Sequence, residues 1–185
     1  FTYNYLNYDL WLNLFIADFV STVVVFVFSL ILKNASTYDP YWSVAPIVIE
    51  NFKNMRTDVE TELGVHLMVN SSFRSYQDQE AVYNDFKNIS LKYADAYAAR
   101  PGHSEHQTGL AIDITSLEHP YITNNDNSFD KSKEYEWLKN NCHKYGFILR
   151  YPKGKEHITG YNTESWHFRY VGVDIATKIY QEDLT

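Results

Sequence analysis

Two short motifs in this sequence carry the residue types of a catalytic zinc site. The stretch Ser104–Asp113 places His106 and Asp113 seven positions apart, on either side of a glycine and a short apolar run. Far downstream, Glu164 and His167 stand three positions apart. Two imidazole nitrogens and one carboxylate oxygen make three ligands, which leave the fourth position of a zinc ion open for water. Glu164 is then a free carboxylate close to the last ligand.

The spacing alone leaves other interpretations open, because a His-x6-Asp pattern carries far less information than a His-Glu-x-x-His helix. The sequence has seven histidines. Four of them occupy ordinary strand, loop or helix settings, and we expect no functional role for them: His66, His119, His143 and His157. His106 and His167 differ, since each lies at an expected element boundary with a carboxylate nearby in the sequence.

Length and composition limit the classes of protein that this chain can belong to. Its 185 residues are enough for one domain and an appendage, but not for two full domains. A formal charge of −7 and a pI near 5.4 argue against a nucleic-acid binder, which would need Lys and Arg to neutralise phosphates. The aromatic content of 17% fits a groove or a membrane interface as well as a core.

Cys142 is the only cysteine, so the chain forms no internal disulfide. Any zinc site must therefore use histidine and carboxylate ligands. A single cysteine in an apolar helical setting is usually an inert part of the core rather than a nucleophile. We expect Cys142 to be buried and unreactive.

An apolar segment over residues 10–32 is long enough to cross a bilayer and predicts a membrane span. The alternative is a buried helix of a soluble domain, because Asp18 is costly in lipid. Lys33 follows the segment and no Lys or Arg precedes it, which favours a cytoplasmic C-terminal side and excludes a signal peptide with a basic start. Residues 34–46 are dense in turn formers and aromatics, as in an interfacial loop. We therefore predict two parts, 1–46 and 47–185.

From residue 45 onward the pattern changes to that of a folded domain. Apolar residues at three- and four-residue steps predict an amphipathic helix that ends at Gly64. Its apolar positions are Val48, Phe52, Met55, Val59 and Leu63. A strand is expected over 65–70. A second helix begins at Ser75, with Asp78 placed as in a capping box. Its expected buried face carries Val82, Phe86 and Ile89.

The second half of the domain alternates short strands with loops and helices. Turn formers predict loops over 94–107 and 116–132. A helix is expected over 132–145, with Gly146 at its end. Its inward positions are Trp137, Leu138 and Cys142. Strands are expected over 110–115, 147–150 and 166–171, and a short last helix begins at Asp174. This irregular order predicts an α+β fold: a small antiparallel sheet flanked by helices, with a zinc site, preceded by the apolar N-terminal helix.

The motifs resemble those of a known family. Ser-x-His-x-x-Gly-x-Ala-x-Asp over Ser104–Asp113, followed by Glu-x-Trp-His over 164–167, is similar to the pattern of the VanY-type zinc D-alanyl-D-alanine carboxypeptidases. Their relatives include peptidoglycan L,D-carboxypeptidases and the hedgehog amino-terminal domain. Further similarity lies in 71–79, 99–102 and 145–147, so the resemblance spans about residues 50–171. Residues 1–46 resemble the start of steroid 5-alpha-reductase-like membrane proteins.

The resemblance assigns roles to individual residues. It implies that one Zn²⁺ ion is bound by His106, Asp113 and His167. It implies that Glu164 is the general base, and that Arg74 binds the carbonyl or terminal carboxylate of the substrate and stabilises negative charge. It further implies that Gln79, Ser104 and Trp166 bind the peptide or wall the site.

Three positions remain open within the resemblance. His103 stands where a bulky or hydroxyl residue is usual, and it could act as an adventitious ligand. Ser165 stands where proline is common. For Arg100 the alternatives are a role in the site and a structural role, in which it caps a loop or pairs with an acid. None of these positions removes a ligand from the expected zinc site.

The resulting hypothesis is a monomeric zinc carboxypeptidase that removes the terminal D-alanine from peptidoglycan stem peptides. One alternative is an L,D-carboxypeptidase acting on tetrapeptides, and another is a non-catalytic, zinc-stabilised binding module for peptidoglycan. A third is a fragment in which 1–46 belong to a different type of membrane protein. The first hypothesis implies a cell-envelope enzyme anchored by residues 10–32 with its catalytic domain outside, the orientation opposite to that favoured by Lys33.

Overall fold

The computed structural model describes residues 41–121 and 128–185, together with six single helical positions nearer the start of the chain. Those six are Leu12, Ile16, Phe19, Val20, Val23 and Val27. The chain separates into two compact units, Phe1–Pro40 and Tyr41–Thr185. The second unit carries the fold and the motifs described below.

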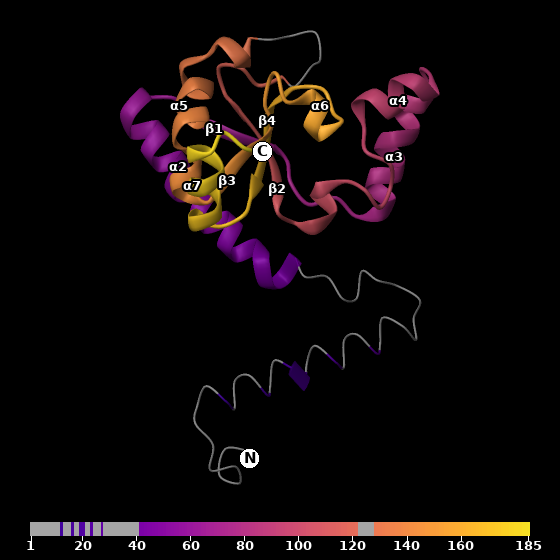
Figure 1. Ribbon diagram of the computed structural model, residues 1–185, viewed down its shortest axis with the longest axis horizontal. Coiled ribbons are helices and arrows are strands. Elements are labelled where there is room, and N and C mark those ends of the chain that lie inside the picture. The colour runs from indigo at the N-terminus through magenta and orange to yellow at the C-terminus, as the bar shows by residue number, and fades with distance from the viewer. Residues whose placement is uncertain are drawn as a thin grey trace. The chain divides into compact units, whose positions relative to one another are not determined.

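A four-stranded antiparallel sheet forms the centre of this unit (Figure 1). Its strands follow the spatial order β1-β2-β4-β3. They are β1 (Leu67–Ser71), β2 (Ala111–Ser116), β3 (Phe147–Tyr151) and β4 (Glu164–Tyr170). The small antiparallel sheet predicted from the sequence is confirmed, and each strand boundary lies within two residues of the predicted one.

Helices lie to both sides of the sheet, which confirms the α+β class. In Figure 1, α2, α5 and α7 gather on one side, and α3 and α4 lie on the other. The α-helices are α2 (Tyr41–Leu63), α3 (Tyr76–Lys87), α4 (Leu91–Tyr97), α5 (Lys133–Asn141), α6 (Glu156–Thr159) and α7 (Val173–Gln181). The described part of this unit also contains three 3-10 turns: η2 (Glu105–Thr108), η3 (Phe129–Lys131) and η4 (Cys142–Tyr145).

Helix α2 buries the apolar stripe that its sequence predicted. Val48, Met55 and Val59 are buried in the core, and Phe52 and Leu63 pack against it. The helix begins at Tyr41, so the loop predicted over residues 34–46 is wrong for its last six positions. Pro46 and its turn-forming neighbours suggested a break, but a proline removes only one backbone hydrogen bond, and the helix continues past it.

The predicted membrane span over residues 10–32 lies outside the described residues, apart from the six single positions. Within the part of the chain that the structure describes, no helix combines the length and the apolar character needed to cross a membrane.

Helix α3 begins as predicted. The Ser75 hydroxyl accepts a hydrogen bond from the Asp78 backbone N–H, and the Asp78 carboxylate accepts one from the Ser75 N–H. This capping box satisfies two donors that would otherwise lack partners. The helix ends at Lys87, so Ile89 falls beyond it and is 68% exposed, against the prediction that it faces inward. Val82 and Phe86, the other two predicted positions, are partly buried, and the fully buried positions are Gln79 and Tyr83.

Two short elements interrupt regions predicted as loops. Helix α4 starts at the cap residue Ser90, whose hydroxyl accepts from the Tyr93 N–H, and it buries Ala94. Seven residues are too few to produce a clear helical period in the sequence. In the loop predicted over 116–132, turn η3 buries Phe129 in the core, while residues 122–127 are not described.

The helix predicted over 132–145 is confirmed as α5 continuing into η4. Leu138 and Cys142 are buried, and burial raises the pKa of the Cys142 thiol to about 12, which fits the expected inert cysteine. Trp137 is only partly buried, and its indole N–H donates to the Glu62 carboxylate. Gly146 ends the turn at φ +81°, and a Cβ there would lie 2.6 Å from the Tyr170 ring.

We predict that Met55→Ala lowers the free energy of unfolding by about 2–5 kcal/mol, because it leaves a cavity between α2 and the core. Chemical denaturation followed by circular dichroism measures this change. Lys53→Ala is the matched control, since Lys53 is exposed on the same helix and its loss should change stability by about 0.5 kcal/mol or less. Equal stabilities for the two variants would show that α2 does not pack as described.

Candidate metal centre

The pairing of β2 with β4 brings two of the predicted ligands together. In this antiparallel register Asp113 lies opposite His167. Directly opposed residues of an antiparallel pair project to the same face of a sheet, with Cβ atoms about 5 Å apart. Both side chains are buried. Their meeting therefore follows from backbone hydrogen bonding rather than from a flexible loop.

The third predicted ligand, His106, comes from turn η2, just before β2. Gly109 ends this turn at φ +70°, a conformation that glycine adopts at little cost, and its N–H donates to the His106 carbonyl. The His106 ring is buried, and its Nδ1 lies 2.7 Å from the Ser72 carbonyl oxygen. That contact directs Nε2 toward Asp113.

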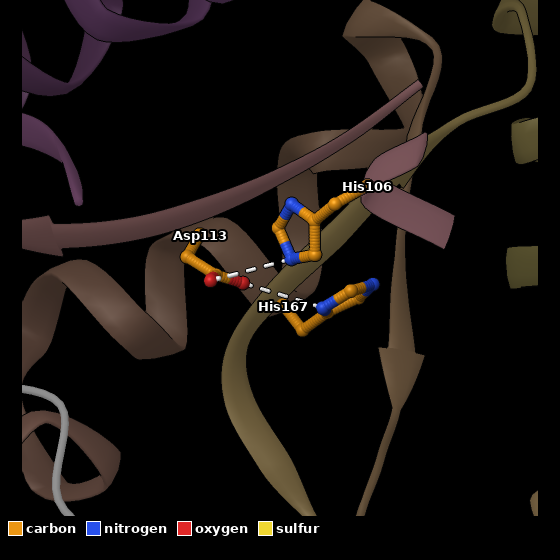
Figure 2. Close-up of side chains that lie close together, drawn as sticks. All are labelled: His106, Asp113 and His167. Atoms are coloured by element: carbon orange, nitrogen blue, oxygen red, sulfur yellow. Dashed lines mark ion pairs between the residues drawn. The ribbon is translucent and has the colours of Figure 1, made fainter. Parts of the chain in front are cut away.

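Figure 2 shows the Asp113 carboxylate facing both imidazole rings, with an ion pair to each. His106 Nε2 lies 3.4 Å from Asp113 Oδ2, and His167 Nδ1 lies 3.2 Å from Asp113 Oδ1. One ligand atom from each of the three residues falls within 4.8 Å of the other two. The structure thus brings together the whole predicted ligand set.

Two atoms of this cluster are buried without a hydrogen bond from the described residues: His106 Nε2 and Asp113 Oδ1. An unsatisfied buried polar atom normally costs about 1–3 kcal/mol, so its presence needs a physical explanation. A bound cation would satisfy both atoms. Two imidazole nitrogens and a carboxylate oxygen are the donors that zinc prefers, and three protein ligands leave one position open. The residues therefore fit a catalytic zinc ion.

Burial and neighbouring charged groups shift the pKa values of the carboxyl groups in and beside the cluster. Burial raises the pKa of the Glu164 carboxyl to about 7, with Asp113 adding to the rise and His167 opposing it. Burial alone would also raise the pKa of Asp113, but its contacts with His106 and His167 hold it well below the usual range. An ionised carboxylate among buried side chains attracts a cation.

Arg74 and Gln79 form a connected pair beside the ligands. Arg74 Nη2 lies 3.6 Å from Asp113 Oδ2, and its Nη1 donates to Gln79 Oε1 at 3.0 Å. Gln79 is buried in α3, and its Nε2 donates to the Ala99 carbonyl at 2.7 Å. The cap residue Ser75 fixes the start of α3, and that helix in turn fixes the guanidinium.

One cavity of about 380 Å³ collects every residue that was assigned a role from the sequence. These are Arg74, Gln79, Ser104, His106, Asp113, Glu164, Trp166 and His167. Its other lining residues include the aromatic side chains of Phe86, Tyr93 and Tyr97 from α3 and α4. Helix α4, which the sequence did not predict, therefore supplies part of the candidate site.

The three open positions have defined places. His103 is exposed and is not among the residues that line the cavity or form the ligand cluster. Arg100 makes two 3.0 Å contacts with the Asp95 carboxylate and is not among the residues that line the cavity, so it takes the structural role of an acid pair. Ser165 is buried, and its hydroxyl has no hydrogen-bond partner among the residues described.

Glu105 was not singled out from the sequence, yet it borders the cavity. Its carboxylate contacts Arg150, Arg169 and His167. Burial by itself would raise the pKa of Glu105, but these partners outweigh it and lower the pKa to about 2. Its position next to His106 did not predict a role for Glu105, because its two arginine partners come from β3 and β4, far along the sequence.

Comparison with protein families finds a match over most of this unit. The model of the VanY family, described as D-alanyl-D-alanine carboxypeptidase, matches residues 42–173. YodJ of Bacillus subtilis (strain 168) is 43% identical over 131 residues, which are 69% of this chain and 46% of YodJ. The chain thus spans about half the length of that relative.

Solved structures share the fold. The LdcB LD-carboxypeptidase has a TM-score of 0.69 and 39% identity, with 75% of this chain and 64% of that one covered. The vancomycin resistance D,D-pentapeptidase VanY in complex with Zn(II) has a TM-score of 0.63 and 32% identity, with 74% and 78% covered. None of these matches supports the resemblance of residues 1–46 to steroid 5-alpha-reductase-like proteins.

We predict that the chelator-treated protein regains one zinc ion per chain after dialysis against Zn²⁺, because a single cluster among the described residues offers three ligands. Asp113→Asn and His167→Ala should each reduce the retained zinc to a small fraction, measured by inductively coupled plasma mass spectrometry. His103→Ala is the matched control and should keep the full amount. Retention of zinc by His167→Ala, or its loss from His103→Ala, would place the ion elsewhere.

Proposed function

Because the chain belongs to the VanY family of D-alanyl-D-alanine carboxypeptidases, we propose that it is a zinc-dependent carboxypeptidase that removes the terminal D-alanine from peptidoglycan stem peptides. The observation that carries this proposal is the shared cavity of the His-Asp-His cluster, the Glu164 carboxylate and the Arg74 guanidinium. The Zn(II) complex of the VanY neighbour supports the choice of metal.

His106, Asp113 and His167 would hold the ion, the two histidines through Nε2 and Nδ1 respectively. When bound, zinc supplies Lewis acidity, which lowers the pKa of a water molecule and polarises a carbonyl group. The Ser72 carbonyl keeps the His106 ring oriented for this task.

Glu164 is the proposed general base. Its Oε2 lies 3.5 Å from His167 Nδ1, one of the atoms that would hold the ion, so the carboxylate lies beside the proposed metal position. There it takes a proton from the attacking water and later returns the proton to the leaving amine. Trp166 lines the same cavity and limits the access of bulk water.

Arg74 is the proposed anion-binding group. Its guanidinium is partly buried and is the one arginine or lysine side chain among the residues lining this cavity. It binds the terminal carboxylate or the carbonyl oxygen of the peptide and stabilises the negative charge that develops there.

Gln79 and Ser104 complete the peptide-binding side of the proposal. Both polar atoms of the Gln79 amide already bond within the protein, one to Arg74 and one to Ala99. Gln79 therefore contributes by holding Arg74 in place. Ser104 lies at the cavity wall directly before η2, where its hydroxyl orients the peptide.

A second candidate reaction is the removal of D-alanine from a tetrapeptide, where it follows an L-configured centre. The observation that favours it is the higher identity to the LdcB LD-carboxypeptidase, 39% against 32% for the D,D-pentapeptidase. The presence of Glu164 in the cavity argues against the third candidate, a binding module without turnover.

Since peptidoglycan lies outside the cytoplasmic membrane, the catalytic unit is proposed to act there, with residues 10–32 as its anchor.

Glu164→Gln should lower the rate of D-alanine release at least about 100-fold, because an amide cannot accept the proton of the attacking water. Release from a muramyl pentapeptide is followed with a D-amino acid oxidase coupled assay, and zinc content is checked in parallel. Glu80→Gln, an exposed position on α3, is the control and should retain full activity. An active Glu164→Gln variant with full zinc would refute the proposed base. Peptide binding without release by the unaltered protein would favour a binding module.

The two candidate substrates separate the D,D- and L,D-activities. We expect kcat/KM to be roughly 10-fold or more higher for the pentapeptide ending in D-Ala-D-Ala than for the tetrapeptide, since specificity appears in this ratio. Initial rates with both peptides at several concentrations give the comparison. A preference of the same size for the tetrapeptide would replace the first candidate with the second.

A further inference from the structure

The two histidines of the cluster face Asp113 through different ring nitrogens. His106 approaches with Nε2, at 3.4 Å, and His167 approaches with Nδ1, at 3.2 Å. A neutral imidazole has a lone pair on only one nitrogen, and only that nitrogen can bind a metal. To bind a metal in this way, each ring must carry its proton on the opposite nitrogen. A hydrogen-bond acceptor at that nitrogen would keep the proton there.

Both of those opposite nitrogens face an oxygen that can only accept a hydrogen bond. For His106 the acceptor is the Ser72 backbone carbonyl, 2.7 Å from Nδ1. For His167 it is Glu105 Oε2, 3.4 Å from Nε2. An acceptor at this position selects the tautomer with the proton on the facing nitrogen. The two acceptors differ in one respect, because the carbonyl survives any side-chain substitution, whereas Glu105 can be replaced.

The Glu105 carboxylate is itself held in one orientation. Its Oε1 accepts from Arg150 Nε at 2.9 Å and lies 2.9 Å from Arg169 Nη1, which leaves Oε2 to face His167. Arg169 and His167 stand two positions apart on β4 and so project to the same face. Arg150 lies where the register of β3 against β4 shifts, between Leu149 and Tyr151. Such irregularities redirect a side chain.

We propose that Glu105 is a positioning residue for the zinc centre: clamped by Arg150 and Arg169, it binds the Nε2 proton of His167 and thereby directs Nδ1 toward the metal. This inference rests on the proposed zinc function. If Glu105 served only to pair with the two arginines, its Oε1 contacts would be sufficient. Its second oxygen, Oε2, instead faces the ring of His167. The side chain of Glu105 is 15% exposed, so water competes little for that oxygen.

The test compares zinc affinities of the full chain by competition with a chromophoric chelator. Glu105→Gln should weaken zinc binding about 10- to 100-fold, because an amide can turn its N–H₂ toward Nε2 and no longer selects the tautomer. Asp95→Asn is the matched control: it also removes a carboxylate bound to an arginine, Arg100, and Asp95 does not line the cavity. Its affinity should equal that of the unaltered protein. Equal affinity for Glu105→Gln, or equal losses in both variants, would overturn the proposal.

A second measurement needs no substitution. Long-range ¹H–¹⁵N correlation spectra of the zinc-loaded protein should show His167 with its proton on Nε2 and His106 with its proton on Nδ1. A proton on Nδ1 of His167 would overturn the proposal even if Glu105→Gln failed to fold. If the unaltered protein bound no zinc, the proposed function would fail. The same spectra of the metal-free protein at about pH 10, where imidazole is neutral, would then test the positioning role separately, by showing which ring nitrogen of His167 carries the proton.

Discussion

The register of β2 against β4 is the constraint on which the candidate site depends. Because Asp113 pairs with His167, a carboxylate and an imidazole meet on one face of the sheet without any contribution from a loop. A slip of one residue would turn one of the two side chains to the opposite face. The neighbouring strands on both sides reinforce this register, since β1 pairs with β2 and β3 pairs with β4. The sheet is thus a scaffold that sets the distance between two candidate ligands.

The charges in the site come from the ionisable side chains that line the cavity beside the sheet. Asp113, Glu105 and Glu164 are three carboxyl groups in one cavity, with two imidazoles and the Arg74 guanidinium among them. Arg150 and Arg169 neutralise Glu105 from outside the cluster, so its charge does not compete with Asp113 for the ion. The unsatisfied atoms His106 Nε2 and Asp113 Oδ1 are left for a cation. A bound ion would therefore also stabilise the folded state, because the unfolded chain offers no preformed site.

The sequence predicted the parts of this structure whose signals are local. The apolar period of α2, the capping box at Ser75 and the ligand motifs around His106 and His167 all lie within short windows, and each is found where it was expected. Helix α4 was too short to show a period, and Pro46 wrongly suggested a loop at the start of α2. The wall that α4 gives to the cavity was missed for the same reason.

The contacts that unite distant segments could not be predicted in the same way. Glu105 joins two arginines from separate strands, and the Gln79 amide spans Arg74 and the Ala99 carbonyl. No spacing in a single sequence encodes such pairings, because they depend on how the sheet and helices pack. The resemblance to the VanY family identified the candidate ligands, while only the fold explains what holds these side chains in place.

The proposed chemistry depends on a zinc ion held by His106 through Nε2, by His167 through Nδ1 and by the Asp113 carboxylate. A crystal structure of the zinc-loaded protein with data collected at the zinc absorption edge tests this claim directly. We predict a single strong anomalous peak at about 2.0–2.2 Å from those three atoms, with a fourth position open to the cavity. A peak at other side chains, or ligation of His167 through Nε2, would contradict it.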